Sequence, residues 1–229
     1  MAVLGVDACR AGWVGVVLAG AGRLDARRVG AVVSATIAGL VSQVDDAEAI
    51  AVDIPVGLPT AGPRAADRLA YAFLGPRRAS IFVTPVRPAL EATSFRDANR
   101  LARELTGAGI SRQAYALRRK ILEVERWRRS CPKPVYEGHP ELSFALLADA
   151  PLGASKKSWT GMRQRLEMLA RVGIELPADL GPAGVRAGAD DVLDAAVLAW
   201  TARRIQLGQA VSFPSPPEDL AGVAAAIWG

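Results

Sequence analysis

Three short apolar runs, far apart in the chain, each end on an acidic residue, and this pattern constrains the fold more than any other feature. The runs cover residues 3–6, 49–52 and 134–136, and the acids are Asp7, Asp53 and Glu137. Runs this short and this apolar predict buried strands rather than helices. A fourth segment opens a helical pattern with three acids, Asp190, Asp191 and Asp194. Because side chains at the carboxyl ends of neighbouring strands meet at one edge of a sheet, we expect these acids to converge.

The order of the expected elements indicates an α/β fold. Strands are expected at 3–6, 12–18 and 27–33, as an antiparallel meander with a glycine-rich turn between the last two. A helix capped by Ser34 follows, and the buried strand 49–52 comes next. This order predicts a ribonuclease H-like fold, with a mixed five-stranded sheet flanked by helices. Three of its strands would be antiparallel and two parallel.

The segment 60–132 interrupts this order and is strongly basic. Helical patterns cover 64–74, 94–106 and 111–129, and no strand pattern occurs among them. The segment has 15 Lys and Arg against 6 Asp and Glu, whereas the remainder has 13 against 17. We therefore expect a basic helical insertion within a single domain of residues 1–229. Its charge would attract a polyanion such as nucleic acid, although arginines also occur on helices that merely face solvent.

Composition excludes several classes of protein. An apolar fraction of 51% with 22% charged residues is typical of a globular domain. No apolar run approaches the 18 residues of a membrane span, so no membrane partner is expected. The start of the chain lacks a signal-peptide pattern, and Cys9 and Cys131 are its two cysteines, which together predict a reduced, cytoplasmic protein. The single histidine, His139, makes a Cys/His nucleophile at Cys9 an unfavoured alternative.

The acids predict a divalent metal site. Mg²⁺ and Mn²⁺ prefer carboxylate oxygens, and a pair of such ions about 4 Å apart can cleave a phosphodiester bond. Asp191 and Asp194 are three residues apart and so share one face of the last helix. Structural alternatives stay open: an Asp at a strand end can cap a turn, Asp190 can be the N-cap of the last helix, and Asp191 can complement the helix dipole. A structural role is harder to assign to Asp194, because a third acid is unexpected on a helix so rich in Ala and Leu.

Seven motifs along nearly the whole chain resemble one known family. They are GVDACRAGW at 5–13, AVDIPVGLP at 51–59, RRASIF at 77–82, KILEV at 120–124, EGHPELSF at 137–144, KK at 156–157 and DDVLDA at 190–195. Together and in this order they resemble the DUF429 family, which is classed as predicted nucleases of ribonuclease H-like fold. The resemblance implies the same fold and activity for this chain.

The acids also resemble those of Holliday-junction resolvases of the RuvC type, whose last helix carries an Asp-x-x-Asp pair. Asp191 and Asp194 match that pair. By this likeness Asp7, Asp53, Asp191 and Asp194 would be the catalytic ligands of Mg²⁺ or Mn²⁺, with Glu137 as a further catalytic acid. A homodimer would suit a two-stranded substrate, by the same analogy.

Basic side chains near the motifs are candidates to bind substrate phosphates. They are Arg10, Arg77, Arg78, Lys156 and Lys157. Each of them can equally be a solvated surface residue. His139 is a candidate for proton transfer, with a structural role beside a helix start as the alternative.

Two other functions compete with the metal-dependent nuclease. A non-catalytic nucleic-acid-binding protein would need only the basic insertion. A phosphotransferase of the actin-like superfamily would also place an Asp after its first strand. The turn after Asp7 has no Ser or Thr to bind ATP phosphates, however, and the chain is short for such a two-domain enzyme.

Overall fold

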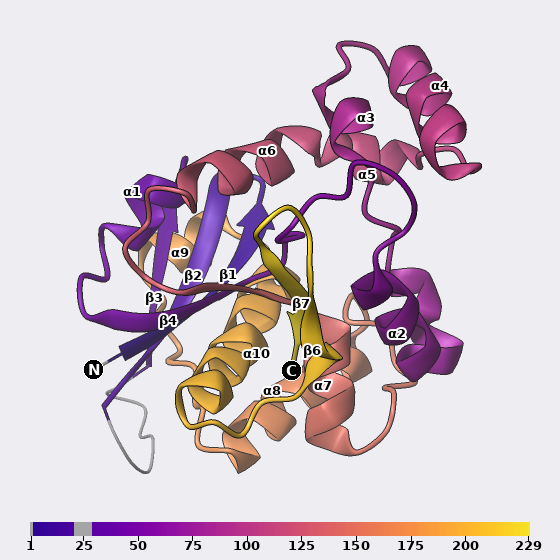
Figure 1. Cartoon of the computed structure of the whole chain (residues 1–229). Coiled ribbons are helices and arrows are strands. Elements are labelled where there is room, and N and C mark those ends of the chain that lie inside the picture. The colour runs from indigo at the N-terminus through magenta and orange to yellow at the C-terminus, as the bar shows by residue number, and fades with distance from the viewer. Residues whose placement is uncertain (1, 21–28) are drawn as a thin grey trace.

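The computed structural model describes residues 2–20 and 29–229 and contains a mixed sheet flanked by helices (Figure 1). The strands are β1 (Ala2–Cys9), β2 (Gly12–Ala19), β3 (Val29–Ser34), β4 (Ala47–Val52), β5 (Val135–Gly138), β6 (Ser212–Asp219) and β7 (Ala224–Trp228). Their order in the sheet is β3-β2-β1-β4-β5-β7-β6. The meander β1–β3 is antiparallel, whereas β4 runs parallel to β1 and β5 parallel to β4. The mixed α/β sheet is thus confirmed.

The expected number of five strands is wrong, because the sheet formed by the described residues has seven. The two additional strands are β7, parallel to β5, and β6, antiparallel to β7. β6 contains Pro214, Pro216 and Pro217, and proline is normally excluded from strand interiors because it lacks an N–H donor. It is tolerated here because β6 lies at the edge of the sheet. The expected glycine-rich turn at 20–22, and the start of the strand expected at 27–33, fall largely outside the described residues.

The helices follow the expected segments with some shifts at their ends. They are α1 (Ile37–Val41), α2 (Ala65–Leu74), the 3-10 helix η2 (Gly75–Ser80), α3 (Arg87–Glu91), α4 (Phe95–Thr106), α5 (Arg112–Ala116), α6 (Arg118–Trp127), α7 (Pro140–Ala148), α8 (Trp159–Arg171), α9 (Pro182–Arg186) and α10 (Ala189–Gln206). Thr36, not Ser34, caps α1, and Gly188, not Asp190, is the N-cap of α10. The helix expected over 111–129 is divided at Leu117, which ends α5 and precedes α6.

Helix α10 lies directly against the centre of the sheet. A Cβ atom at Gly5 on β1 would stand only 2.0 Å from the backbone nitrogen of Ala199 and 2.1 Å from the carbonyl oxygen of Ala195. Only a glycine permits this approach, because any larger residue would push the helix away from the strand. Side chains alternate between the faces of a strand, so Asp7 lies on the same face as Gly5, toward α10.

The other face of the sheet is covered by α1 and α6 (Figure 1). Ile121 and Val124 of α6 are fully buried in that core. The other insertion helices α3, α4 and α5 extend beyond the sheet in Figure 1 and share a small apolar cluster of their own. Helix α6 thus anchors this part of the insertion to the sheet, while α2 packs against Ile227 of β7. None of the helices in the described ranges is long and apolar enough to cross a membrane.

Candidate functional site

Four of the acids expected from the sequence meet in one cavity of about 340 Å³. Asp7 comes from the end of β1, Asp53 follows β4 directly, and Asp191 and Asp194 come from the first turns of α10. The close contact between β1 and α10 brings Asp194 beside the strand ends. Asp194 is fully buried and Asp7 is only 7% exposed, so both carboxyl groups have left bulk water. The cavity therefore has an acidic floor built by two strands and one helix.

Burial and mutual repulsion oppose ionisation of these acids. Burial, followed by the charges of Asp53 and Asp194, raises the pKa of Asp7 well above its ordinary value. Burial also raises the pKa of Asp53 to about 6 and that of Asp194 to about 7. Burial raises the pKa of Asp191, which also accepts a capping hydrogen bond of 3.1 Å from the backbone nitrogen of Gly188. A site of this kind is stabilised by any cation that enters it.

Lys156 supplies such a charge within the structure. Its Nζ donates to Oδ2 of Asp194, and its side chain lines the same cavity. Burial opposes the lysine charge, but the carboxylates of Asp194, Asp7 and Asp53 outweigh it and raise the pKa of Lys156. The second oxygen of Asp194, Oδ1, is buried and has no hydrogen-bond partner among the described residues. One ammonium therefore compensates part of the charge of four acids.

The loop that carries Lys156 is held in place by two arginines. Nη2 of Arg77 donates to the carbonyl oxygen of Ala154 at 2.8 Å, and Nη1 of Arg165 donates to the same oxygen at 3.2 Å. Arg165 is fully buried and also donates to Oε1 of Glu141 at 2.6 Å. Arg77 was expected to bind substrate phosphate, and the structure instead places one of its nitrogens on this loop.

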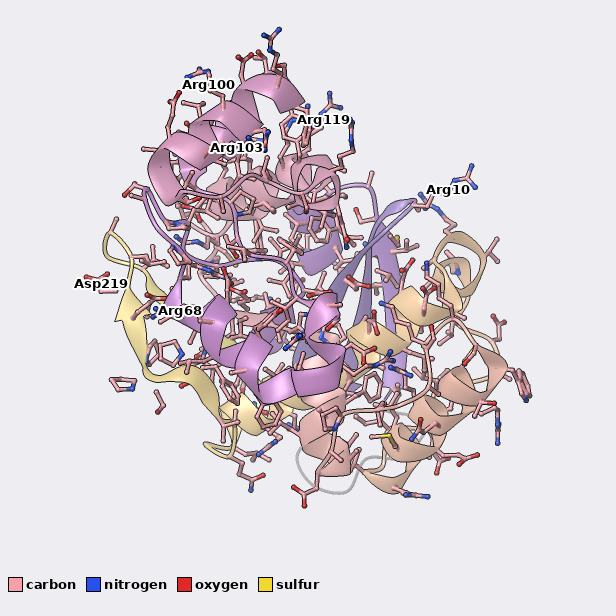
Figure 2. All side chains as sticks on the ribbon, turned by 90° about the vertical axis from the view of Figure 1, so that its right-hand side faces the viewer. Arg10, Arg68, Arg100, Arg103, Arg119 and Asp219 are labelled. Carbon is pink, nitrogen blue, oxygen red and sulfur yellow. The ribbon has the colours of Figure 1, made fainter. Side chains whose placement is uncertain are left out.

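The remaining basic residues singled out from the sequence do not line the cavity. Arg10 is exposed at the tip of the β1–β2 hairpin and points away from the molecule in Figure 2. Arg78 is exposed and lies over the ring of Tyr71, with its Cζ atom 5.4 Å from the ring centre. Lys157 is exposed next to Lys156. Of the five candidates, Lys156 alone lines the cavity.

Glu137 lies outside the cavity, in a neighbouring network of buried ions. Its Oε2 accepts from Nη1 of Arg64 at 2.7 Å and from the backbone nitrogen of Val56 at 2.7 Å, and its Oε1 accepts from Nη2 of Arg64 at 2.8 Å. Arg64 is 1% exposed and also binds Asp67. These bonds fix the loop that follows Asp53. The geometry gives Glu137 a role in positioning this loop.

His139 and Glu141 also line the cavity, at the start of α7. Nδ1 of His139 accepts from the backbone nitrogen of Leu142 at 3.3 Å, which leaves the proton on Nε2, 3.4 Å from the carbonyl oxygen of Ser80. Burial lowers the pKa of His139, so the neutral ring is favoured. Glu141 has one oxygen on Arg165, while its buried Oε2 has no hydrogen-bond partner among the described residues and lies 3.8 Å from Nε of Arg77. Glu141 lies in the first turn of α7 and was not among the site residues predicted from the sequence.

The basic insertion supplies another part of the cavity wall. The residues concerned are Ser80, Phe82, Gln113 and Leu117. The sequence analysis assigned them to a loop and a helix without a functional role. The motif at 77–82 contains Ser80 and Phe82, but no local pattern shows that these four residues join the acids, because they do so only when the insertion folds back over the sheet.

The acids have the chemistry of a hard-cation site, but they do not form a closed one. Carboxylate oxygens suit Mg²⁺ and Mn²⁺, and the unpartnered Oδ1 of Asp194 is a ready donor. Within residues 2–20 and 29–229, however, no three His, Cys, Asp or Glu side chains form a group that could hold a metal ion as they stand. The ammonium of Lys156 lies on Asp194, where a bound metal ion would otherwise balance the negative charge of the acids.

Residues 5–219 match the family described as a protein of unknown function, DUF429. Because the match covers nearly the whole chain, the chain belongs to the DUF429 family. No curated protein and no solved structure matches the sequence. The family description names no activity, so the functional argument rests on the chemistry of the cavity.

Proposed function

We propose that this member of the DUF429 family is a metal-dependent nuclease of ribonuclease H-like fold that hydrolyses phosphodiester bonds in DNA or RNA. The observation that carries the proposal is the meeting of four carboxyl groups, Asp7, Asp53, Asp191 and Asp194, in one cavity at the strand ends. Buried like charges are unfavourable unless a cation compensates them. One lysine compensates them only in part, which favours a site that takes up a further cation.

The strand order supports the ribonuclease H-like part of the proposal. The first five strands follow the order β3-β2-β1-β4-β5, with three antiparallel strands and then parallel ones. An antiparallel meander of three strands followed by parallel strands is the arrangement expected from the sequence for that fold. The hairpin of β6 and β7 extends the sheet beyond it.

Asp7, Asp53 and Asp194 would hold Mg²⁺ or Mn²⁺, with Asp191 beside them on α10. When bound, such an ion would supply charge that stabilises the leaving oxygen and helps to activate water. The protein's own residues do the rest: the acids orient the ion, and Arg64 with Glu137 fixes the loop after Asp53. Since Lys156 lies on Oδ2 of Asp194, it would have to move aside, and its ammonium would then be free to bind a substrate phosphate.

The outer surface of the insertion supports a polyanionic substrate. Arg103 and Arg119 are exposed there, as Figure 2 shows. Arg100 is labelled on the same lobe but is paired with Glu104 at 3.0 Å. Exposed arginines of this kind attract phosphate backbones without reading the base sequence.

One observation favours a second candidate, a non-catalytic nucleic-acid-binding protein. As the structure stands, Lys156 neutralises Asp194, and no described group of acids is closed around a metal position. The basic insertion alone would then carry the function.

Cleavage of labelled DNA and RNA, branched and single-stranded, with Mg²⁺, Mn²⁺ or EDTA, tests the proposal. Asp7→Asn and Asp194→Asn should abolish cutting, while Asp45→Asn, an exposed acid away from the cavity, should leave it intact. Binding without cutting by the wild type would favour the non-catalytic protein. If the wild type neither cuts nor binds nucleic acid, the nuclease assignment is wrong, and a small phosphorylated substrate becomes the better account of the acids.

A further inference from the structure

The wall that the insertion adds to the cavity has a chemistry different from that of the acidic floor. Phe82 contributes an aromatic ring, Leu117 an aliphatic side chain and Gln113 an amide. The ring and the aliphatic side chain cannot coordinate a hard cation, and the Gln113 amide lacks the negative charge of the carboxylates. Their presence beside the carboxylates calls for a part of the substrate that is flat, apolar and edged with hydrogen-bonding groups.

Several contacts fix this wall to the core. Nζ of Lys120 donates to the carbonyl oxygen of Gly12 at 2.9 Å and lies 4.3 Å from the centre of the Trp13 ring. Glu123 accepts from Nε1 of Trp13 at 3.2 Å and from the backbone nitrogen of Ile37 at 2.8 Å. These bonds hold α6, and Leu117 directly precedes it. The wall is therefore built before any substrate binds.

One side of Phe82 packs against apolar residues, and the other side is partly exposed toward the cavity. Its ring packs against both the core beneath α6 and the small apolar cluster of the insertion, yet it is only half-buried and lines the cavity. His139 holds the chain just before it through the carbonyl oxygen of Ser80. A fixed aromatic face beside acidic residues is suited to stacking a nucleobase.

Gln113 offers hydrogen bonds that the protein does not use. Its side chain is exposed and makes no hydrogen bond to any described residue. An amide has one acceptor oxygen and two N–H donors, and this pattern can pair with the edge of a base. Leu117 adds an apolar surface next to it.

We propose that Phe82, Gln113 and Leu117 bind the base of one unpaired nucleotide beside the scissile phosphate. The substrate class is then single-stranded or locally unpaired nucleic acid. A cavity of about 340 Å³ lies at the lower end of the range for ligand pockets, so it takes one nucleotide but not a stacked base pair. This inference rests on the proposed nuclease function and specifies its substrate.

The test uses single-stranded oligonucleotides whose cleavage position has been mapped, each compared with a version that lacks the base on one side of the cut. In the wild type, loss of the bound base should lower kcat/KM about tenfold, the usual scale of one stacked base. Phe82→Ala should cut the intact strand about tenfold more slowly and should not respond further to the abasic change. A fully paired duplex should be cut more slowly than the single strand.

Phe73→Ala is the matched control, because Phe73 is a partly exposed aromatic residue that does not line the cavity. It should behave as the wild type on both substrates. Gln113→Ala changes an exposed side chain and therefore tests the same wall if Phe82→Ala fails to fold. It should lower kcat/KM on intact strands, by an amount that differs with the identity of the bound base. Three results would each overturn the inference. They are equal cleavage of intact and abasic strands by the wild type, faster cleavage of duplex than of single strand, and a further tenfold loss when Phe82→Ala is given the abasic strand.

A separate readout distinguishes this inference from the nuclease proposal. Binding of the same intact and abasic strands is measured by fluorescence anisotropy in EDTA, where no cleavage occurs. If the wild type never cuts but binds the intact strand about tenfold more tightly, through Phe82, the base site stands and the nuclease proposal falls. If it cuts but shows no preference in either assay, the nuclease proposal stands and the base site is wrong.

Discussion

Replacing Lys156 by methionine tests the electrostatic account of the cavity most directly. The substitution keeps a long side chain but removes the ammonium that contacts Asp194. Asp194 is fully buried and Asp7 is almost fully buried. In the variant, therefore, water can only partly replace the lost ammonium as a partner of their carboxylates. We expect the variant to fold less stably than the wild type, and the loss should depend on pH and on divalent cations.

The expected loss follows from burial. Breaking a fully buried ion pair costs about 3–5 kcal/mol, because one charge remains without a partner. The side chain of Lys156 is 32% exposed, so water already replaces part of this pairing, and we reduce the expected loss to about 2 kcal/mol at pH 8. In a chain of this length that corresponds to a decrease in Tm of about 4–8 °C. At pH 6 the loss should be smaller, because Asp194, with a pKa of about 7, can bind a proton instead.

Thermal unfolding in EDTA and in Mn²⁺, at pH 6 and pH 8, measures these effects. Mn²⁺ should restore more stability to Lys156→Met than to the wild type, since the ion no longer competes with the lysine. Lys157→Met is the matched control and should unfold as the wild type does, because Lys157 is exposed. An unchanged Tm at pH 8, or an equal loss at both pH values, would refute the electrostatic account. If stability is lost but Mn²⁺ does not restore it, the electrostatic account stands, and only the idea that a metal ion replaces Lys156 is refuted.

Three further predictions concern the surroundings of the cavity. Asp53 and Asp194 have folded-state pKa values of about 6 and 7, above the ordinary 3.8, so their contribution to stability is full below about pH 4 and is lost as pH rises through 6–7. Urea unfolding against pH should show this decline, and Asp194→Asn should flatten it. Arg64→Met should lower the free energy of unfolding by about 3–5 kcal/mol in the same assay, because two buried carboxylates lose their cation. Gly5→Ala should lower stability by at least about 1–3 kcal/mol and abolish any cleavage by displacing α10 from β1, whereas Gly30→Ala, with no atom within 4 Å of the new Cβ, should be tolerated.

The sequence predicts much of the site, because the pattern that marks it is local. An apolar run followed by an acid specifies both a buried strand and the side chain at its end, as at Asp7 and Asp53. The spacing of Asp191 and Asp194 likewise specifies one helix face. The mixed sheet follows from the same runs. These features need no knowledge of distant contacts.

The rest depends on contacts between segments far apart in the chain. Glu137 ends a strand just as Asp53 does, but a buried arginine 73 residues earlier in the chain takes up both its oxygens. Nothing in the sequence around Arg64 marks it as buried. Strand β6 was missed because its three prolines argue against a strand unless it lies at a sheet edge. Edge position, partner choice and the cavity wall at Phe82 are all properties of the folded chain.

The way this protein treats its other buried acids strengthens the case that the cavity binds a cation. Glu125 is nearly buried and accepts hydrogen bonds from three arginines, at 2.7, 2.9 and 3.2 Å. Glu137 is bound through both oxygens by Arg64. In both cases arginines therefore take up both oxygens of the buried acid. In the cavity, by contrast, four aspartates face Lys156, and Oδ1 of Asp194 has no hydrogen-bond partner among the described residues. Burial raises the pKa values of Asp53 and Asp194 despite the charge of Lys156, so their ionised forms are costly in this fold. Neutral residues of the same size would be more stable there, so the excess of carboxylates supports the proposal that the cavity receives a positively charged ligand.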